Sequence, residues 1–224
     1  MPPILIVDPS FPGVYRTPTT TPSPNPKEFA IRPIVLALAL CFVTVLPAQS
    51  PSTSPASQPQ LDLASHPDRP QANPAEVDTI VHTVHAFFST LSVPAGGKLD
   101  RNRLNSLFVP NGRIAYSIEP SSHHPADVLF MTPEQYADNS DAQSTTGFYD
   151  RNPANEIEQF GLMAHVYATY ESRLNPNDPK PIARGIKSIE LLHSNNRWYI
   201  LQVYWDSERP GNPLPESYLH DSTH

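Results

Sequence analysis

The distribution of proline most strongly limits where this chain can fold. Of its 28 prolines, 16 lie within residues 1–74, which hold only one of the eight glycines and neither tryptophan. Proline lacks a backbone N–H and fixes φ, so a proline-dense segment cannot complete the hydrogen-bond ladder of a helix or a sheet. Residues 75–224 have the size of one domain with a single core. The sequence therefore predicts one folded domain behind a proline-rich leader.

The acidic charge of the chain lies in that domain. Residues 1–74 carry four basic and four acidic side chains, so the formal net charge of −7 belongs to residues 75–224. An acidic surface repels phosphate backbones, and we expect no nucleic-acid partner. The single cysteine, Cys41, lies outside the domain, where it can form neither a disulfide nor a thiolate metal site for the fold.

An apolar run in the leader bears on localisation. Residues 34–46 are apolar except for Thr44, and they follow Arg32 and precede a short segment ending at Ala48. A membrane-spanning helix needs about 20 apolar residues, whereas a signal-peptide core has about 7–15. We predict that residues 1–48 are an N-terminal extension with a signal peptide, and that the protein is exported, either periplasmic or secreted. The alternative is an uncleaved membrane anchor.

The segments that flank the domain are predicted to lack regular structure. Residues 49–74 are rich in Ser, Pro and Gln and hold few large apolar side chains, so they cannot bury enough surface to offset the entropy of ordering. They are interpreted as a disordered tether. Residues 209–224 are interpreted as a flexible tail, which leaves residues 75–208 as the domain.

The first half of the domain shows helical periodicity. Pro74 is predicted to open a helix, Asp100 to cap a second, and Thr132 with Pro133 to begin a third. Between the second and third helices, residues 113–118 alternate like a strand. The first helix is expected to bury one apolar stripe, made of Val77, Ile80, Val81, Val84, Phe87, Phe88 and Leu91.

The second half is predicted to be an antiparallel meander. The expected strands are residues 148–159, 162–173, 182–193 and 197–207, with tight turns at Phe160-Gly161 and Asn195-Asn196. One face of this sheet would present Leu162, Ala164, Val166, Ala168, Tyr170, Ile189, Leu191, Trp198 and Ile200. The predicted register pairs His165 with Glu190, Tyr167 with Ser188, Glu171 with Arg184, Leu191 with Ile200, and Glu190 with Leu201.

The element order and three strings of sequence carry a family resemblance. The strings GLMAHVYATYESR, RGIKSIELL and NNRWYILQVYWDSE make residues 75–208 similar to the nuclear transport factor 2-like superfamily, and within it to ketosteroid isomerases and SnoaL-like polyketide cyclases. The resemblance implies an α+β cone in which three N-terminal helices pack on a strongly curved, mostly antiparallel sheet and leave a hydrophobic pocket at the open end. The chain contains no complete catalytic set of these enzymes, so no catalytic role is carried over.

Asp206 is the first candidate for acid–base chemistry. It ends the last strand and, on the predicted register, shares a face with Trp198, Gln202 and Tyr204, near Tyr170. Partial burial at the mouth of a cone would raise the pKa of such a carboxyl toward that of a general base. Two alternatives stay open, since a strand-ending Asp can bond the following backbone and Lys187 could pair with it.

His165 is the second candidate. Its predicted partner Glu190 could orient the imidazole, but a polar and aromatic sheet face can equally be a dimer surface or a solvated ladder. The choice depends on which sheet face the helices cover. The pocket-lining side chains expected for a cone are Tyr116, Tyr170, Lys187, Trp198, Gln202 and Tyr204.

The histidines do not predict a metal site. His82 and His85 are three residues apart on the first helix but lie off its apolar stripe, and His123-His124 lies in a loop. The chain lacks the glycine spacings of phosphate-binding loops and the GxSxG motif of serine hydrolases. We expect neither a metal nor another cofactor.

Three functions remain open from the sequence. The domain could bind a small apolar or aromatic molecule in the cone, or act as an isomerase, dehydratase or cyclase through Asp206 or His165. It could also be a non-catalytic module with a filled core that forms a homodimer through its sheet face. Because each candidate catalytic group has a neutralising partner within reach, Lys187 or Glu190, the binding function is favoured.

Overall fold

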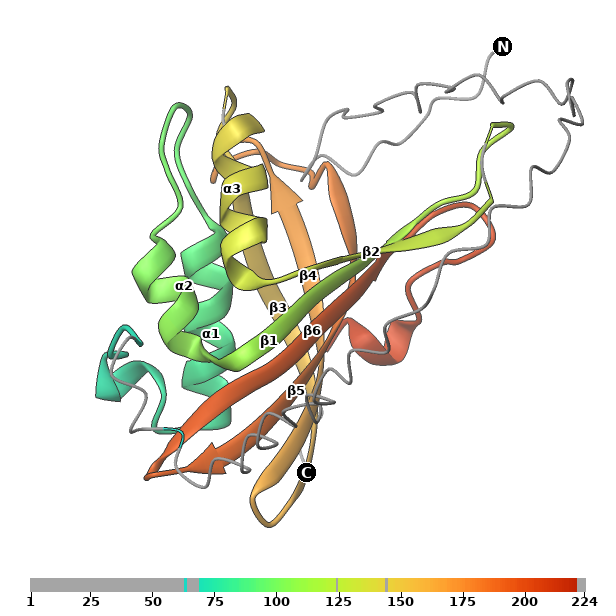
Figure 1. The fold of residues 1–224 in the computed structure, drawn as a ribbon. Coiled ribbons are helices and arrows are strands. Elements are labelled where there is room, and N and C mark those ends of the chain that lie inside the picture. The colour runs from blue at the N-terminus through green and yellow to red at the C-terminus, as the bar shows by residue number, and fades with distance from the viewer. Residues whose placement is uncertain (1–62, 64–68, 124, 144, 221–224) are drawn as a thin grey trace, which may run out of the picture. The chain divides into compact units, whose positions relative to one another are not determined.

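The computed structural model describes residues 63, 69–123, 125–143 and 145–220 (Figure 1). The predicted signal segment, residues 34–46, lies outside the described residues, as does most of the predicted tether. No helix among the described residues has both the length and the apolar character needed to cross a membrane.

Three α-helices lie on one side of a curved sheet (Figure 1). Two of the predicted caps are confirmed: Asp100 Oδ1 accepts from the N–H of Arg103 at 2.9 Å, and Thr132 Oγ1 accepts from the N–H of Gln135 at 3.2 Å. Such caps satisfy N–H groups that the first helical turn leaves without partners. The helices are η1 (Pro74–Glu76, a 3₁₀ turn), α1 (Ile80–Leu91), α2 (Arg101–Leu107) and α3 (Pro133–Gln143).

The first helix is shorter than predicted. The 3₁₀ turn that Pro74 opens ends at Val77, whose φ of −135° is not helical, and α1 begins only after Thr79 caps it. Val77 is still buried, but Val81 is 52% exposed and does not belong to the apolar stripe. Because of this break, residues before and after it do not follow one helical period. The apolar stripe predicted for a single continuous helix therefore does not hold across it.

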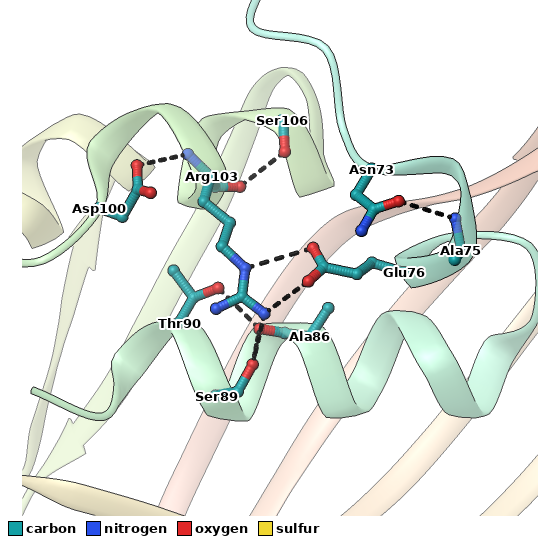
Figure 2. Close-up of polar contacts among 9 residues, drawn as sticks. All are labelled: Asn73, Ala75, Glu76, Ala86, Ser89, Thr90, Asp100, Arg103 and Ser106. Carbon is teal, nitrogen blue, oxygen red and sulfur yellow. Dashed lines mark hydrogen bonds and ion pairs between the residues drawn. The ribbon is translucent and has the colours of Figure 1, made fainter.

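Arg103 ties the N-terminal turn to the first two helices (Figure 2). Its guanidinium donates to both carboxylate oxygens of Glu76, at 3.2 and 2.9 Å, and to Ser89 Oγ at 2.7 Å. Two-pronged contacts of this kind fix orientation as well as distance. Arg103 therefore holds η1 against α1 from its own position on α2.

The sheet has six strands in the order β2-β1-β6-β5-β4-β3 and does not close. Every neighbouring pair is antiparallel except β1 and β6, which are parallel. This is the α+β architecture that the sequence predicts, with β2 as an additional strand. The strands are β1 (Phe108–Ile118), β2 (Asp127–Met131), β3 (Tyr149–Phe160), β4 (Met163–Arg173), β5 (Ala183–Ser194) and β6 (Arg197–Ser207).

The hairpin turns fall at or beside their predicted positions. Asn195 and Asn196 both have positive φ, 50° and 59°, as a two-residue turn with the twist of a hairpin requires. The turn between β3 and β4 is centred one residue later than predicted, because Phe160 pairs with Met163 and the turn residues are Gly161 and Leu162. Gly161 takes a φ of 58°, which a glycine adopts without steric cost.

The predicted register is confirmed for β4 and β5 but fails halfway along β6. His165 pairs with Glu190 and Leu191 with Ile200, yet Glu190 pairs with Gln202 instead of Leu201. Leu201 is the extra residue of a β-bulge. A bulge shifts the alternation of side chains by one position. Residues beyond the bulge therefore lie on the face opposite to the predicted one.

The three α-helices cover only one face of the sheet, which we call the inner face; the opposite one is the outer face. Residues on the inner face include Ala164, Val166, Ala168, Tyr170, Ile189, Leu191, Ile200, Val203 and Trp205, and all of them are buried. Side chains of α1, α2 and α3 complete the same core. The apolar stripe of α1 thus packs against the face that contains Tyr170, away from His165.

Residues 208–220 form a C-terminal strap that lies against the outer face. The 3₁₀ turn η2 (Glu216–Tyr218) lies beside β3 and β4, and Thr169 Oγ1 donates to the carbonyl of Tyr218. Arg184 pairs with Glu208 at the start of the strap. That hydrogen bond lowers the pKa of Glu208, although partial burial opposes the shift. The sequence predicts a flexible tail here, and these contacts are a difference from that prediction.

Candidate functional site

An ion pair is buried at the centre of the inner face. Lys187 Nζ on β5 lies 3.2 Å from Asp150 Oδ2 on β3, and their side chains are 4% and 0% exposed. Asp150 Oδ1 also accepts a hydrogen bond of 2.7 Å from Ser172 Oγ. Removing two charges from water costs several kcal/mol per ion, and their attraction repays this only in good geometry. A buried charge pair is therefore a feature to explain.

Aromatic rings surround the Lys187 ammonium. Its nitrogen lies 4.3 Å from the ring centroids of both Tyr170 and Trp205, and 5.7 Å from that of Phe88. The faces of aromatic rings attract cations within about 6 Å. Tyr116 stacks on Trp205 with the ring centroids 5.3 Å apart and extends this aromatic box toward β1. The box is occupied by the protein's own lysine.

Local strand geometry places Asp150 in this interior. Asp150 pairs with Ser172 across β3 and β4, where the even-numbered residues of β4 face inward. A contact with the end of α1 fixes its backbone, because the N–H of Asp150 donates at 3.0 Å to Oγ of Ser92, the residue that follows α1. A register irregularity follows between Arg151 and Ala154. Asp150 thus belongs to the inner face although most of β3 is polar.

Sequence reasoning identifies part of this cluster. Tyr116, Tyr170 and Lys187, which are predicted to line a pocket, belong to this cluster, and Phe88 lies in the predicted stripe of α1. Asp150 and Trp205 were not predicted to be there. The feature that could have identified Asp150 is its position opposite Ser172, which faces inward. Trp205 faces inward only because of the bulge at Leu201.

Asp206 does not lie in the interior. The bulge turns it to the outer face together with Gln202 and Tyr204, so the prediction that these three share a face with Trp198 is wrong. Asp206 Oδ1 accepts from Arg209 Nη1 at 2.7 Å and from the N–H of Ser207 at 2.9 Å. This is the alternative in which the aspartate bonds the backbone that follows it. The expected partner Lys187 pairs with Asp150 instead.

His165 lies on the outer face, which the helices do not cover. Its Nε2 is 2.9 Å from Ser188 Oγ and 3.7 Å from Glu190 Oε1, and its ring meets that of Tyr167 edge to face at 4.5 Å. Trp198 lies on the inner face next to His193, with the ring centroids 5.1 Å apart. The structure therefore places neither predicted catalytic residue beside the buried ion pair.

Two hollows lie among the described residues, and neither is lined by Lys187 or Asp150. One, of 320 Å³, is an outer-face groove lined by Glu156, Glu158, His165, Tyr167, Ser217 and Tyr218. The other, of 230 Å³, lies at the far end of the β1–β2 hairpin. Within the described ranges, no group of three or more His, Cys, Asp or Glu side chains is arranged to hold a metal ion.

The outer face carries an apolar patch on the β2-β1-β6 half of the sheet. Phe130, Ala115 and Tyr204 lie in one row across the three strands, because Ala115 pairs with both of the others. Phe130 is 67% exposed and Tyr204 43%. Val128 and the bulge residue Leu201 are also exposed. We call Val128, Phe130, Leu201 and Tyr204 the outer patch.

Fold and site together define an α+β protein with an unclosed curved sheet, a buried inner face that the α-helices cover and a partly apolar outer face. No model of a known protein family matches the chain, and no curated protein does. Solved structures do match it. One is a nuclear transport factor 2-like protein of unknown function from Silicibacter pomeroyi, with 11% identity and a TM-score of 0.39, over 58% of this chain and 92% of that one.

Two other solved structures are similar to a comparable share of the chain. A protein of unknown function with a cystatin-like fold from Nostoc punctiforme has 14% identity and a TM-score of 0.43, over 61% of this chain and 91% of its own. A provisionally named scytalone dehydratase from Novosphingobium aromaticivorans has 12% identity and a TM-score of 0.42, over 58% and 82%. The resemblance stated for the sequence recurs among these structures, and no residue role passes from them to this chain.

Proposed function

We propose that the domain is a non-catalytic module that associates with a second copy of itself through the outer patch. The observation that supports this proposal is the exposure of four large apolar or aromatic side chains, two on β2 and two on β6, on either side of β1. Contiguous exposed apolar surface on a folded domain marks an interaction site. Lys187 is paired with Asp150 in the core, while Asp206 and His165 lie on the outer face, and this arrangement supports a structural role over an enzymatic one.

Charge favours this half of the outer face for self-association. Each copy carries a net charge of −7, so two copies repel each other unless they meet where charge is lowest. The outer patch itself has no ionisable group apart from the Tyr204 phenol, and the charged residues near it on this half of the face, Arg113 and Asp206, have opposite signs. The other half of the face carries Glu156, Glu158 and Glu190. In a two-fold dimer through that half, these carboxylates would lie opposite the same acidic surface of the second copy and repel it.

Phe130→Glu should convert the associated protein to single chains of 24.8 kDa. The new carboxylate would have to be buried without a partner in each half of the interface, which costs several kcal/mol. Phe130 is 67% exposed, so the fold itself should tolerate the change. Sedimentation velocity on the full chain at several concentrations measures the mass.

Phe160→Glu is the matched control. Phe160 is 80% exposed at the tip of the β3–β4 hairpin, so the same substitution is made outside the outer patch. We expect this variant to keep the mass of the unmodified chain. Dissociation by Phe160→Glu alone, or a single-chain mass for the unmodified protein, would contradict the proposal.

A second candidate is the binding of a small apolar or aromatic molecule inside the cone, as favoured by the sequence. The buried pair of Lys187 and Asp150 within aromatic walls supports it, because small-molecule sites combine apolar and aromatic walls with a few placed polar groups. Native mass spectrometry of the chain purified from its source should then show a retained adduct that Lys187→Met loses. Equal adducts on the unmodified protein and on Lys187→Met, or no adduct on either, would count against interior binding. Neither result would affect the outer-patch proposal.

A further inference from the structure

We propose that the outer-face groove beside the C-terminal strap binds a small organic cation of the alkylammonium class. The groove measures 320 Å³ and lies between β3, β4 and η2. Sites for small molecules begin at about 300 Å³. The groove shares no residue with the outer patch, so this site is additional to self-association.

The walls of the groove are aromatic. The rings of Tyr167 and Tyr218 have their centroids 5.7 Å apart and are inclined by 52°, which forms an open corner. The His165 ring is held edge to face against Tyr167. Tyrosine faces attract ammonium ions, and paired aromatic walls are the usual means of recognising alkylated amines. The Tyr167–Tyr218 corner provides such walls on a protein surface.

The charge of the groove selects cations over anions. Glu156 and Glu158 are among the lining residues, and Glu190 Oε1 lies 3.7 Å from Nε2 of the lining residue His165. In the described part of the chain, neither lysine nor arginine is among the lining residues. The net charge of −7 adds a general attraction for cations.

The strap provides one wall and holds it in position. Ser217 and Tyr218 belong to η2, and the carbonyl of Tyr218 accepts a hydrogen bond from the buried hydroxyl of Thr169. The pair of Arg184 and Glu208 fixes the start of the strap on the same sheet. A wall that is in place before the ligand arrives reduces the entropy lost on binding. The groove is therefore formed by the folded chain rather than by a loose tail.

The test is a titration of the full chain with tetramethylammonium chloride at constant ionic strength, followed by the aromatic NMR signals of tyrosine and histidine. We expect saturable shifts of the Tyr167, Tyr218 and His165 signals. Tyr218→Leu should weaken binding about two- to fivefold, the range of an exposed cation–π contact. Glu158→Gln should weaken it by a similar factor through the lost charge.

Matched controls separate a built site from a general attraction for cations. Glu134→Gln removes an exposed carboxylate on α3, away from the groove, and should leave binding unchanged. Phe130→Glu should also leave it unchanged, whatever that substitution does to the mass of the protein. Equal weakening by Glu134→Gln and Glu158→Gln would overturn the proposal. So would undiminished binding to Tyr218→Leu, or the same shifts with sodium chloride alone.

Discussion

Asp150→Asn should lower the free energy of unfolding by about 3–5 kcal/mol, because it leaves the Lys187 ammonium charged in the interior without a counter-ion. Both side chains are almost fully buried, so water cannot replace the lost carboxylate. The aromatic rings around Lys187 offset only part of the loss, since each cation–π contact contributes about 0.5–2 kcal/mol. Urea unfolding followed by tryptophan fluorescence measures the change.

Two further variants test whether the loss of stability comes from the buried ion pair. The double variant Lys187→Met with Asp150→Leu should recover most of the loss, because replacing both charges by apolar groups removes the need for a counter-ion. Asp78→Asn breaks the surface pair of Asp78 with His82 and should leave the unfolding midpoint nearly unchanged. A loss below about 1 kcal/mol for Asp150→Asn would show that the pair is not dry.

Gly185→Ala should destabilise the fold by about 3 kcal/mol, the upper end of the range for overpacked interiors. A methyl group at this position would collide with the carbonyl oxygen of Asp206 and lie 2.9 Å from Ser207 Cα, both backbone atoms of the paired strand β6. It would also press on the ring of Tyr170, whose hydroxyl is 2.8 Å from Ser207 Oγ. Backbone atoms cannot move aside as a flexible side chain can, so β5 and β6 must separate. Urea unfolding again measures the loss.

Gly161→Ala separates this steric effect from the usual cost of replacing a glycine. Gly161 has a φ of 58° and open space around its Cα, so alanine there should cost only about 1 kcal/mol through backbone strain. If both variants lose the same stability, the close approach of β5 and β6 at Gly185 is not the cause.

The register of β4 and β5 could be predicted because the inward-facing residues are apolar where the two strands pair between their ends. Ala164, Val166, Ile189 and Leu191 alternate with polar residues, and a shift by one residue would bury His165 and Glu190. The Asn195-Asn196 turn then fixes the start of β6. These features are local in sequence, so the residues themselves carry the information.

The far half of β6 could not be predicted in the same way. Beyond the bulge, Tyr204 and Trp205 are adjacent aromatics, so either one could face inward on hydrophobicity alone. The structure selects Trp205, which Tyr116 of the parallel neighbour β1 stacks against. That pairing joins residues about 90 positions apart in the chain. The sequence does not show this long-range contact, so it assigns Asp206 to the wrong face and predicts a catalytic site there.

The site was predictable only where polar residues stand inside an otherwise apolar pattern. Lys187 interrupts the inward series of β5 between Gly185 and Ile189, which marks it as a buried charge. Asp150 lies in a strand with many polar residues and does not stand out. Its role depends on the packing of Ser172 and Ser92 around it, and both contacts are made across elements.

The unclosed sheet has consequences for polymerisation. An open sheet has two edge strands whose free N–H and C=O groups can template fibril growth. Here β2 has only five residues, and β3 contains Pro153 within a register irregularity. Short strands, prolines and bulges are features by which edges resist the addition of another strand. Both edges thus carry features that oppose growth into a continuous ribbon, so the self-association proposed above would use the outer face of the sheet and not its edges.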